Sequence, residues 1–176
     1  MAARYREPMQ RASRDTPAPE LEHLAYLNRA VALAARGVAA GDGGPFGALV
    51  VRDGEVLGEG WNRVLGTHDP TAHAEVTAIR EACARLGSFQ LTGAVVYASC
   101  EPCPMCLGAI YWARPTALYY AATRHDAAAA GFSDAMIYDE IGLSPEQRTV
   151  PFVQVEVPGA AEVFQQWLAK DDRTPY

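Results

Sequence analysis

Apolar residues along this chain alternate between helical and strand spacing, and that alternation constrains the fold more than any other feature of the sequence. A helix is predicted from near Leu21 to Gly37 or Gly41. Asp53-Gly54 separates two runs of β-forming residues and predicts a two-residue hairpin. The elements that the spacing predicts beyond the first helix are, in chain order, strands over 46–51 and 55–61, a helix over 72–85, a strand over 94–98, a helix over 103–113, a strand over 117–121, a helix over 137–141, a strand over 150–157 and a helix over 161–169.

The helix predicted over 72–85 carries clear boundary signals. Asp69-Pro70 stands where a helix cap and a first-turn proline belong, and Gly87 stands where a helix stops. We therefore expect Asp69 to mark the start of this helix.

The order of elements predicts an α/β fold. Helices that alternate with strands, together with one hairpin, give a mixed sheet with helices on both faces. The chain has 176 residues, the size of one ordinary domain. Residues 1–19 contain four arginines and three prolines without apolar periodicity, so we expect a flexible N-terminal tail followed by a single domain over 20–176.

Composition and charge argue against some classes of binding partner. The formal net charge of −6 disfavours polyanionic nucleic acid, because a surface of that sign repels phosphate backbones. The sequence has neither an apolar stretch long enough to span a bilayer nor a signal-peptide core, so we expect no membrane partner. Three of the four cysteines lie within residues 100–106, which favours a metal site in a reducing compartment over a disulfide framework. A cytoplasmic location is therefore expected.

Two short segments, 71–75 and 99–106, carry the residues that predict chemistry. Cys103 and Cys106 lie three positions apart, so both thiols point the same way in a first helical turn, where the helix dipole stabilises thiolates. A C-x-x-C pair alone is ambiguous among redox, structural and catalytic roles. Adding His73 gives three protein ligands, which leaves the fourth position of a zinc ion open, as catalytic sites do.

Glu75 completes this pattern two residues after the histidine. Zinc lowers the pKa of a water ligand from about 15.7 to near 7, and a neighbouring carboxylate can take that proton and pass it to a substrate. The zinc-deaminase signature is H-x-E followed at a distance by P-C-x-x-C, and both parts are present at 73–75 and 102–106. The sequence therefore predicts one zinc ion per subunit, with Glu75 as the proton shuttle.

Other interpretations of the cysteines stay open. Cys100 extends the pair to C-x-x-C-x-x-C, which is compatible with an iron–sulfur cluster, but the fourth cysteine, Cys83, is distant in sequence. We expect both of these cysteines to pack as apolar residues. A non-catalytic zinc-binding interaction domain is a second alternative, although it would have no use for Glu75 and would normally supply a fourth protein ligand.

With these motifs in place, the chain resembles the bacterial guanine deaminases of the cytidine deaminase-like zinc hydrolase superfamily. The resemblance covers about residues 24–176, and the zinc segments identify the chemistry but not the base. The stretches that carry it are Gly-Gly-Pro-Phe-Gly-Ala at 43–48, residues 69–76, residues 100–114 with Ile-Tyr-Trp-Ala at 110–113, residues 130–134 and Tyr176. The resemblance implies a three-layer α/β/α sandwich with a five-stranded mixed sheet, and a homodimer whose C-terminal segments contact or exchange with the partner.

The same resemblance implies a reaction and a set of substrate contacts. Guanine and water would give xanthine and ammonia, with Glu75 accepting the proton of water and then protonating the ring nitrogen beside C2. An asparagine would hydrogen-bond the base, a phenylalanine would stack on it, an aspartate would accept its N–H donors, and the C-terminal tyrosine would close over the site. The residues expected to contact the substrate are Asn62, Phe46, Asp134, Trp112, Tyr176 and Ala72.

These contacts have structural alternatives. Asn62 is also compatible with a turn residue, Phe46 with core packing, Asp134 with a helix N-cap and Trp112 with a helix anchor. Guanosine, cytosine and related aminated heterocycles stay open as substrates. The tRNA adenosine deaminases share both zinc segments but usually carry basic residues at their RNA-facing end, whereas residues 166–176 contain no basic cluster.

Overall fold

The computed structural model describes residues 20–175, which fall into two units. The first unit ends at Ser133 and the second begins at Asp134. The expected tail over 1–19 and the C-terminal Tyr176 lie outside the described residues. The division of the chain into a tail and one domain stays a prediction.

The first unit is built on a mixed sheet. Its strands are β1 (Gly47–Arg52), β2 (Glu55–Trp61), β3 (Val95–Cys100) and β4 (Ala117–Ala122), in the order β2-β1-β3-β4. Strand β1 pairs antiparallel with both β2 and β3, and β3 pairs parallel with β4. The predicted hairpin is confirmed, because β1 and β2 flank Asp53-Gly54 and both turn residues have positive φ.

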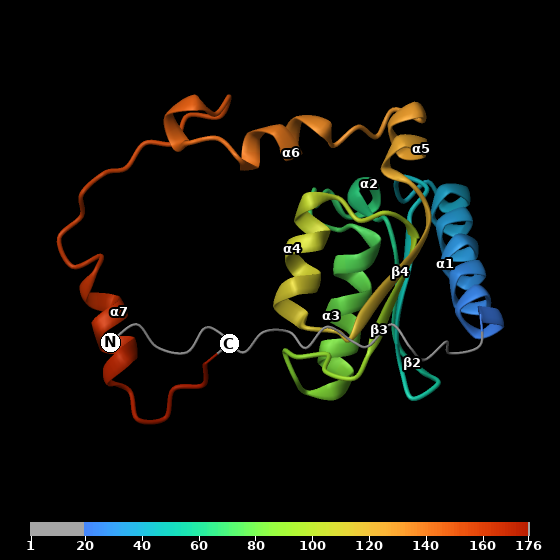
Figure 1. The fold of residues 1–176 in the computed structure, drawn as a ribbon, viewed down its shortest axis with the longest axis horizontal. Helices are drawn as coiled ribbons and strands as arrows, with labels where there is room; N and C mark the ends of the chain where they lie inside the picture. The colour runs from blue at the N-terminus through green and yellow to red at the C-terminus, as the bar shows by residue number, and fades with distance from the viewer. Residues whose placement is uncertain (1–19, 176) are drawn as a thin grey trace. The chain divides into compact units, whose positions relative to one another are not determined.

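Helices cover both faces of this sheet (Figure 1). The helices of the first unit are α1 (Glu20–Ala40), α2 (Val64–Thr67), α3 (Ala74–Leu86), α4 (Pro104–Ala113) and α5 (Arg124–Ala129). Alternate residues of β1 point to opposite faces, so that Ala48 and Val50 pack under α3 and α4 while Leu49 and Val51 pack under α1. The predicted three-layer α/β/α architecture is confirmed.

Two expectations about the secondary structure are wrong. A fifth strand was expected over 150–157, but the sheet in the described part of the chain has four strands and this segment belongs to none. Its valines favour a strand, yet a strand also needs a neighbour that completes its hydrogen-bond ladder. The helix expected from Ala72 begins at Ala74, and its N-cap is His73 rather than Asp69.

Close contact between β2 and α3 fixes the start of that helix. A Cβ on Gly60 would lie 2.2 Å from the carbonyl oxygen of Ala74, so only glycine lets the first turn of α3 rest on the strand. This contact holds the helix end that carries His73 and Glu75 against the sheet.

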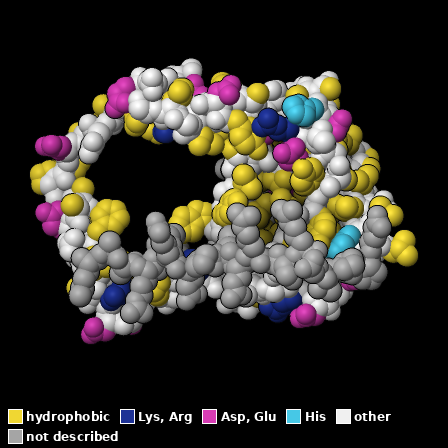
Figure 2. All heavy atoms as spheres, viewed as in Figure 1, with side chains coloured by type: hydrophobic (Ala, Val, Ile, Leu, Met, Phe, Trp, Pro, Cys, Tyr) yellow, Lys and Arg dark blue, Asp and Glu magenta, His cyan; other side chains and the backbone are white. Residues whose placement is uncertain are grey.

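The second unit contains α6 (Ala135–Ile141), a 3₁₀ turn η1 (Pro145–Gln147) and α7 (Glu162–Ala169). None of its described residues is buried, and hydrophobic side chains show on the surface of the molecule (Figure 2). The large exposed apolar residues of this unit include Val153, Phe164 and Leu168. In residues 20–175, no helix combines the length and the apolar character needed to cross a membrane.

Candidate active site

His73 and Cys103 stand at the N-termini of α3 and α4. Each is the N-cap residue of its helix, has extended backbone angles and makes no side-chain cap. An N-cap side chain usually turns back to a free amide of its own helix, but these two turn toward each other. Two helix N-termini, each with partial positive charge, therefore meet at one point.

The three predicted ligands form a compact group. The ligand atoms of His73, Cys103 and Cys106 all lie within 4.8 Å of one another. The Nδ1 atom of His73 is 3.5 Å from the Sγ atom of Cys103 and 3.4 Å from that of Cys106. Tetrahedral zinc with ordinary bond lengths places its nitrogen and sulfur ligands about 3.6 Å apart. The residues present therefore fit a zinc ion with three protein ligands.

The two cysteine thiols differ in the direction of their pKa shifts. A hydrogen bond from Cys106 lowers the pKa of Cys103 to about 4. The same bond, together with burial, raises the pKa of Cys106. A divalent cation would supply the positive charge that lets both sulfurs become thiolates.

Glu75 is buried in the first turn of α3, directly beside this group. Its side-chain carboxylate accepts a hydrogen bond from the Sγ atom of Cys106 at 3.3 Å. Burial raises the pKa of the Glu75 carboxyl. A carboxyl that holds a proton more readily is suited to both accepting and donating one near neutral pH.

Asn62 follows β2 and is buried, 5% exposed. Its Oδ1 atom accepts hydrogen bonds from the backbone amides of Gly44 and Val64, both at 3.2 Å. These bonds bracket a turn, as the structural alternative predicted, and they also fix the orientation of the carboxamide. The backbone amide of Asn62 donates to the carbonyl oxygen of Phe46 at 2.9 Å, which holds the two residues side by side.

One backbone hydrogen bond connects this turn to the metal group. The amide of Arg63 donates to the carbonyl oxygen of Ala72 at 2.9 Å, so that Asn62 and Ala72 lie next to the segment that carries His73. Ala72 is buried there. Backbone hydrogen bonds thus connect Asn62, Phe46 and Ala72 to the segment that carries His73, and their contact with a substrate stays a prediction.

The remaining expected contact residues are Trp112, Asp134 and Tyr176. Trp112 lies near the far end of α4, roughly 13 Å along the helix axis from Cys103 at about 1.5 Å per residue. Asp134 is the N-cap residue of α6 and makes no side-chain cap, but it belongs to the second unit. Tyr176 lies outside the described residues. The roles of these three residues stay predictions.

Two features of the site were missed by sequence reasoning. The ring of Phe132 packs edge-on against that of Phe46, with 5.1 Å between centroids. The loop after β3 is tied to the start of α5, because the thiol of Cys100 donates to the carbonyl of Thr123 at 3.4 Å and the Glu101 carboxylate accepts from the amide of Arg124 at 3.1 Å. The second feature depends on the parallel pairing of β3 with β4, for which the sequence carries no local signal.

Comparison with known proteins agrees with this geometry. The model of the cytidine and deoxycytidylate deaminase zinc-binding region matches residues 21–122. The chain is 58% identical to the guanine deaminase of Bacillus subtilis over 147 residues, which cover 84% of this chain and 94% of that protein. The X-ray structure of a Bacillus subtilis guanine deaminase superposes with a TM-score of 0.85 at 56% identity, covering 88% of this chain and 98% of the other.

The likeness to a tRNA-specific deaminase is shorter. The tRNA-specific adenosine deaminase of Agrobacterium fabrum is 49% identical over 78 residues, which cover 44% of this chain and 51% of that protein. The family's zinc-binding region, by contrast, takes in more than half of the chain and contains all three candidate ligands. This chain therefore belongs to the zinc-binding cytidine and deoxycytidylate deaminase family.

Proposed function

We propose that this protein hydrolyses guanine to xanthine and ammonia with zinc as its cofactor. The observation that carries the substrate assignment is the 58% identity to a guanine deaminase over 94% of that protein's length. The tRNA-specific relative, in contrast, matches less than half of this chain. The ligand group beside a buried glutamate supports the hydrolytic chemistry.

His73, Cys103 and Cys106 would hold the zinc ion. When bound, zinc supplies Lewis acidity that lowers the pKa of water. Glu75 accepts a proton from the attacking water and delivers it to the ring nitrogen beside C2. It then helps a proton reach the departing amino group, so that a C–O bond forms, a C–N bond breaks and the carboxylate returns to its starting state. Its burial and raised pKa suit this double role.

The base would lie against Asn62 and Phe46. The Asn62 oxygen is occupied by two backbone amides, which leaves its amino group to donate a hydrogen bond to the base. Phe46, supported edge-on by Phe132, offers an aromatic face for stacking. Asp134 and Tyr176 are proposed to contact the base from the C-terminal part of the chain.

A homodimer with C-terminal exchange is proposed as the assembly. The described residues of the second unit bury no side chain, and exposed apolar groups lose favourable burial unless something covers them. β4 is an edge strand of the described sheet and carries exposed Tyr119 and Tyr120, which a second copy could cover. We propose the cytoplasm as the location, since all four cysteines are free thiols. Neither nucleic acid nor membrane is proposed as a partner.

The test is ammonia release by the purified, zinc-loaded protein. Guanine, guanosine, cytosine, adenine and a tRNA anticodon stem-loop are assayed in parallel, and xanthine is identified as the product. Xanthine formed from guanine alone supports the proposal. Turnover of another substrate with guanine untouched overturns the substrate assignment but leaves the hydrolytic chemistry in place. The absence of ammonia from every substrate overturns both.

A further inference from the structure

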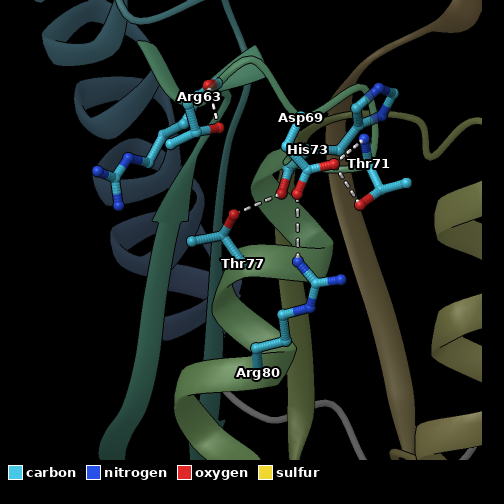
Figure 3. Close-up of polar contacts among 7 residues, drawn as sticks. Arg63, Asp69, Thr71, His73, Thr77 and Arg80 are labelled. Atoms are coloured by element: carbon cyan, nitrogen blue, oxygen red, sulfur yellow. Dashed lines mark hydrogen bonds and ion pairs between the residues drawn. The ribbon is translucent and has the colours of Figure 1, made fainter.

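The loop before α3 is organised around the side chain of Asp69 (Figure 3). Its Oδ1 atom accepts hydrogen bonds from the backbone amide of Thr71 at 2.8 Å and from the Thr71 hydroxyl at 2.7 Å. Its Oδ2 atom lies 3.8 Å from the guanidinium of Arg80. This is an Asx turn, in which the side chain takes the place of a backbone acceptor two residues upstream.

The same loop places the backbone of His73. The amide of Ala72 donates to the carbonyl of Asp69 at 3.0 Å, and the amide of His73 donates to the carbonyl of Thr71 at 2.8 Å. From the helix side, the amide and the hydroxyl of Thr77 both donate to the carbonyl of His73, at 2.9 and 2.8 Å. The histidine backbone is therefore held from both directions.

This arrangement keeps the residues before Ala74 out of the helix. As the N-cap residue, His73 has an extended ψ of 158°, and its imidazole points across to the two sulfurs. One further turn of helix would instead carry the ring around the axis of α3 and away from the cysteines. Asp69 opposes that extension because it fixes Thr71 in the turn.

We propose that Asp69 is a positioning residue for the metal ligand His73. It acts through Thr71 and the loop backbone and does not itself touch zinc or substrate. The inference rests on the proposed function, because it concerns how the chain prepares its metal site. The hydrogen bonds to Thr71 carry the effect, since the contact with Arg80 joins two partly exposed side chains at long range and contributes little.

Zinc affinity is the quantity that this role affects. Residues that orient metal ligands from outside the coordination shell change metal affinity by about 10- to 100-fold when they are removed. Asp69 acts on the backbone of the ligand rather than on its ring, so we expect about a 10-fold loss, at the lower end of that range.

The test measures zinc transfer from the holoenzyme to a chromogenic chelator. Asp69→Ala is expected to bind zinc about 10-fold more weakly than the natural protein. Asp69→Asn keeps the Oδ1 acceptor, and Arg80→Ala keeps the turn, so both are expected to stay near the natural affinity. Thr71→Val removes the hydroxyl but retains the backbone hydrogen bond, and it is expected to give a smaller loss.

Cobalt substitution separates positioning from general loss of stability. The absorption bands of Co²⁺ depend on the ligands and on their geometry, so a misplaced His73 changes the spectrum of Asp69→Ala even where circular dichroism shows an intact fold. Equal zinc affinity and an unchanged cobalt spectrum in Asp69→Ala would overturn the inference. An equal loss of zinc affinity in Arg80→Ala would also overturn the inference, because the ion pair between Asp69 and Arg80 would then be the cause. Failure of the natural protein to bind zinc would instead overturn the proposed function.

Discussion

His73 and Cys103 occupy equivalent positions, the N-caps of α3 and α4, and each turns its side chain toward the other at an Nδ1–Sγ distance of 3.5 Å. Both helices therefore lack a side-chain cap, and a missing cap costs a helix about 1 kcal/mol. A metal ion bound by these two residues offsets that cost, because it holds both N-termini in place. We therefore expect metal binding and the stability of the first unit to be coupled.

Removal of zinc is expected to lower the melting temperature and abolish ammonia release, and added zinc is expected to restore both. A ligand present at 1,000 times its Kd stabilises a protein by about 4 kcal/mol. Cys103→Ala and Cys106→Ala should remove this response. Cys83→Ala is the matched control, because Cys83 is a free, half-buried thiol outside the ligand group. Calorimetry with and without chelator measures the shift, and equal melting temperatures would contradict the coupling.

Glu75→Gln is expected to retain zinc and lose turnover. The amide has nearly the same shape as the carboxyl but cannot shuttle a proton, and general acid–base catalysis contributes about 10²- to 10⁴-fold to rate. Zinc content by mass spectrometry and kcat for guanine are measured on the same preparation. Turnover within a few-fold of the natural enzyme would remove Glu75 from the proposed mechanism.

Asn62→Asp is expected to fold normally and bind the base poorly. The variant keeps an oxygen to accept the amides of Gly44 and Val64, but it replaces the amino group with a second oxygen. A buried acceptor left without its donor costs about 1–3 kcal/mol, which corresponds to roughly 5- to 150-fold in kcat/KM. Asn62→Ala, which also loses the turn contacts, should unfold at a lower temperature. An unchanged kcat/KM in the aspartate variant would limit Asn62 to its role in the turn.

The residues of the zinc site were easier to predict from the sequence than the way in which the backbone positions them. His73, Glu75, Cys103 and Cys106 form a motif whose spacing reflects direct demands of zinc, and the structure brings these residues together. The role of Asp69 was misjudged, because a residue that resembles an N-cap in sequence lies four positions before the true one. The pattern does not reveal that a metal ligand takes the cap position itself.

Long-range partners account for the other differences. Residues 150–157 favour a strand by composition, but composition does not supply the neighbouring strand that would pair with them. Phe132 was not predicted as a companion of Phe46, because 86 residues separate the two rings and only the folded chain brings them together. Local patterns identify elements and motifs, whereas contacts such as these depend on tertiary packing.

Gly60→Ala is expected to disturb the metal site more than Gly58→Ala. The added Cβ would lie 2.2 Å from the Ala74 carbonyl oxygen at Gly60 and 2.3 Å from the Ala78 carbonyl oxygen at Gly58, so the two clashes are nearly equal. Both variants should lose about 1–3 kcal/mol of stability through overpacking. Only the first displaces the turn next to His73, so zinc affinity should fall in Gly60→Ala alone. Equal zinc affinities in two folded variants would show that the contact at Gly60 does not place the ligand.

Ionisation of Tyr97 is expected to lower the free energy of unfolding in alkaline solution. Its ring is buried between α1 and β3, its hydroxyl lies 2.8 Å from Nδ1 of His23, and burial is the main cause that raises its pKa from about 10 to about 12. Because the folded state holds the proton more tightly, this stabilisation is complete below about pH 10 and is lost as pH rises through about 12.

Two pKa units correspond to at most about 3 kcal/mol, which urea unfolding between pH 8 and pH 11.5 can resolve. Tyr97→Phe has no hydroxyl to ionise, so its stability should fall less steeply over the same range. The variant should also be less stable than the natural protein at pH 8, because it lacks the contact with His23. Parallel pH profiles for the two proteins would mean that ionisation of Tyr97 does not oppose folding and that other groups cause the alkaline loss.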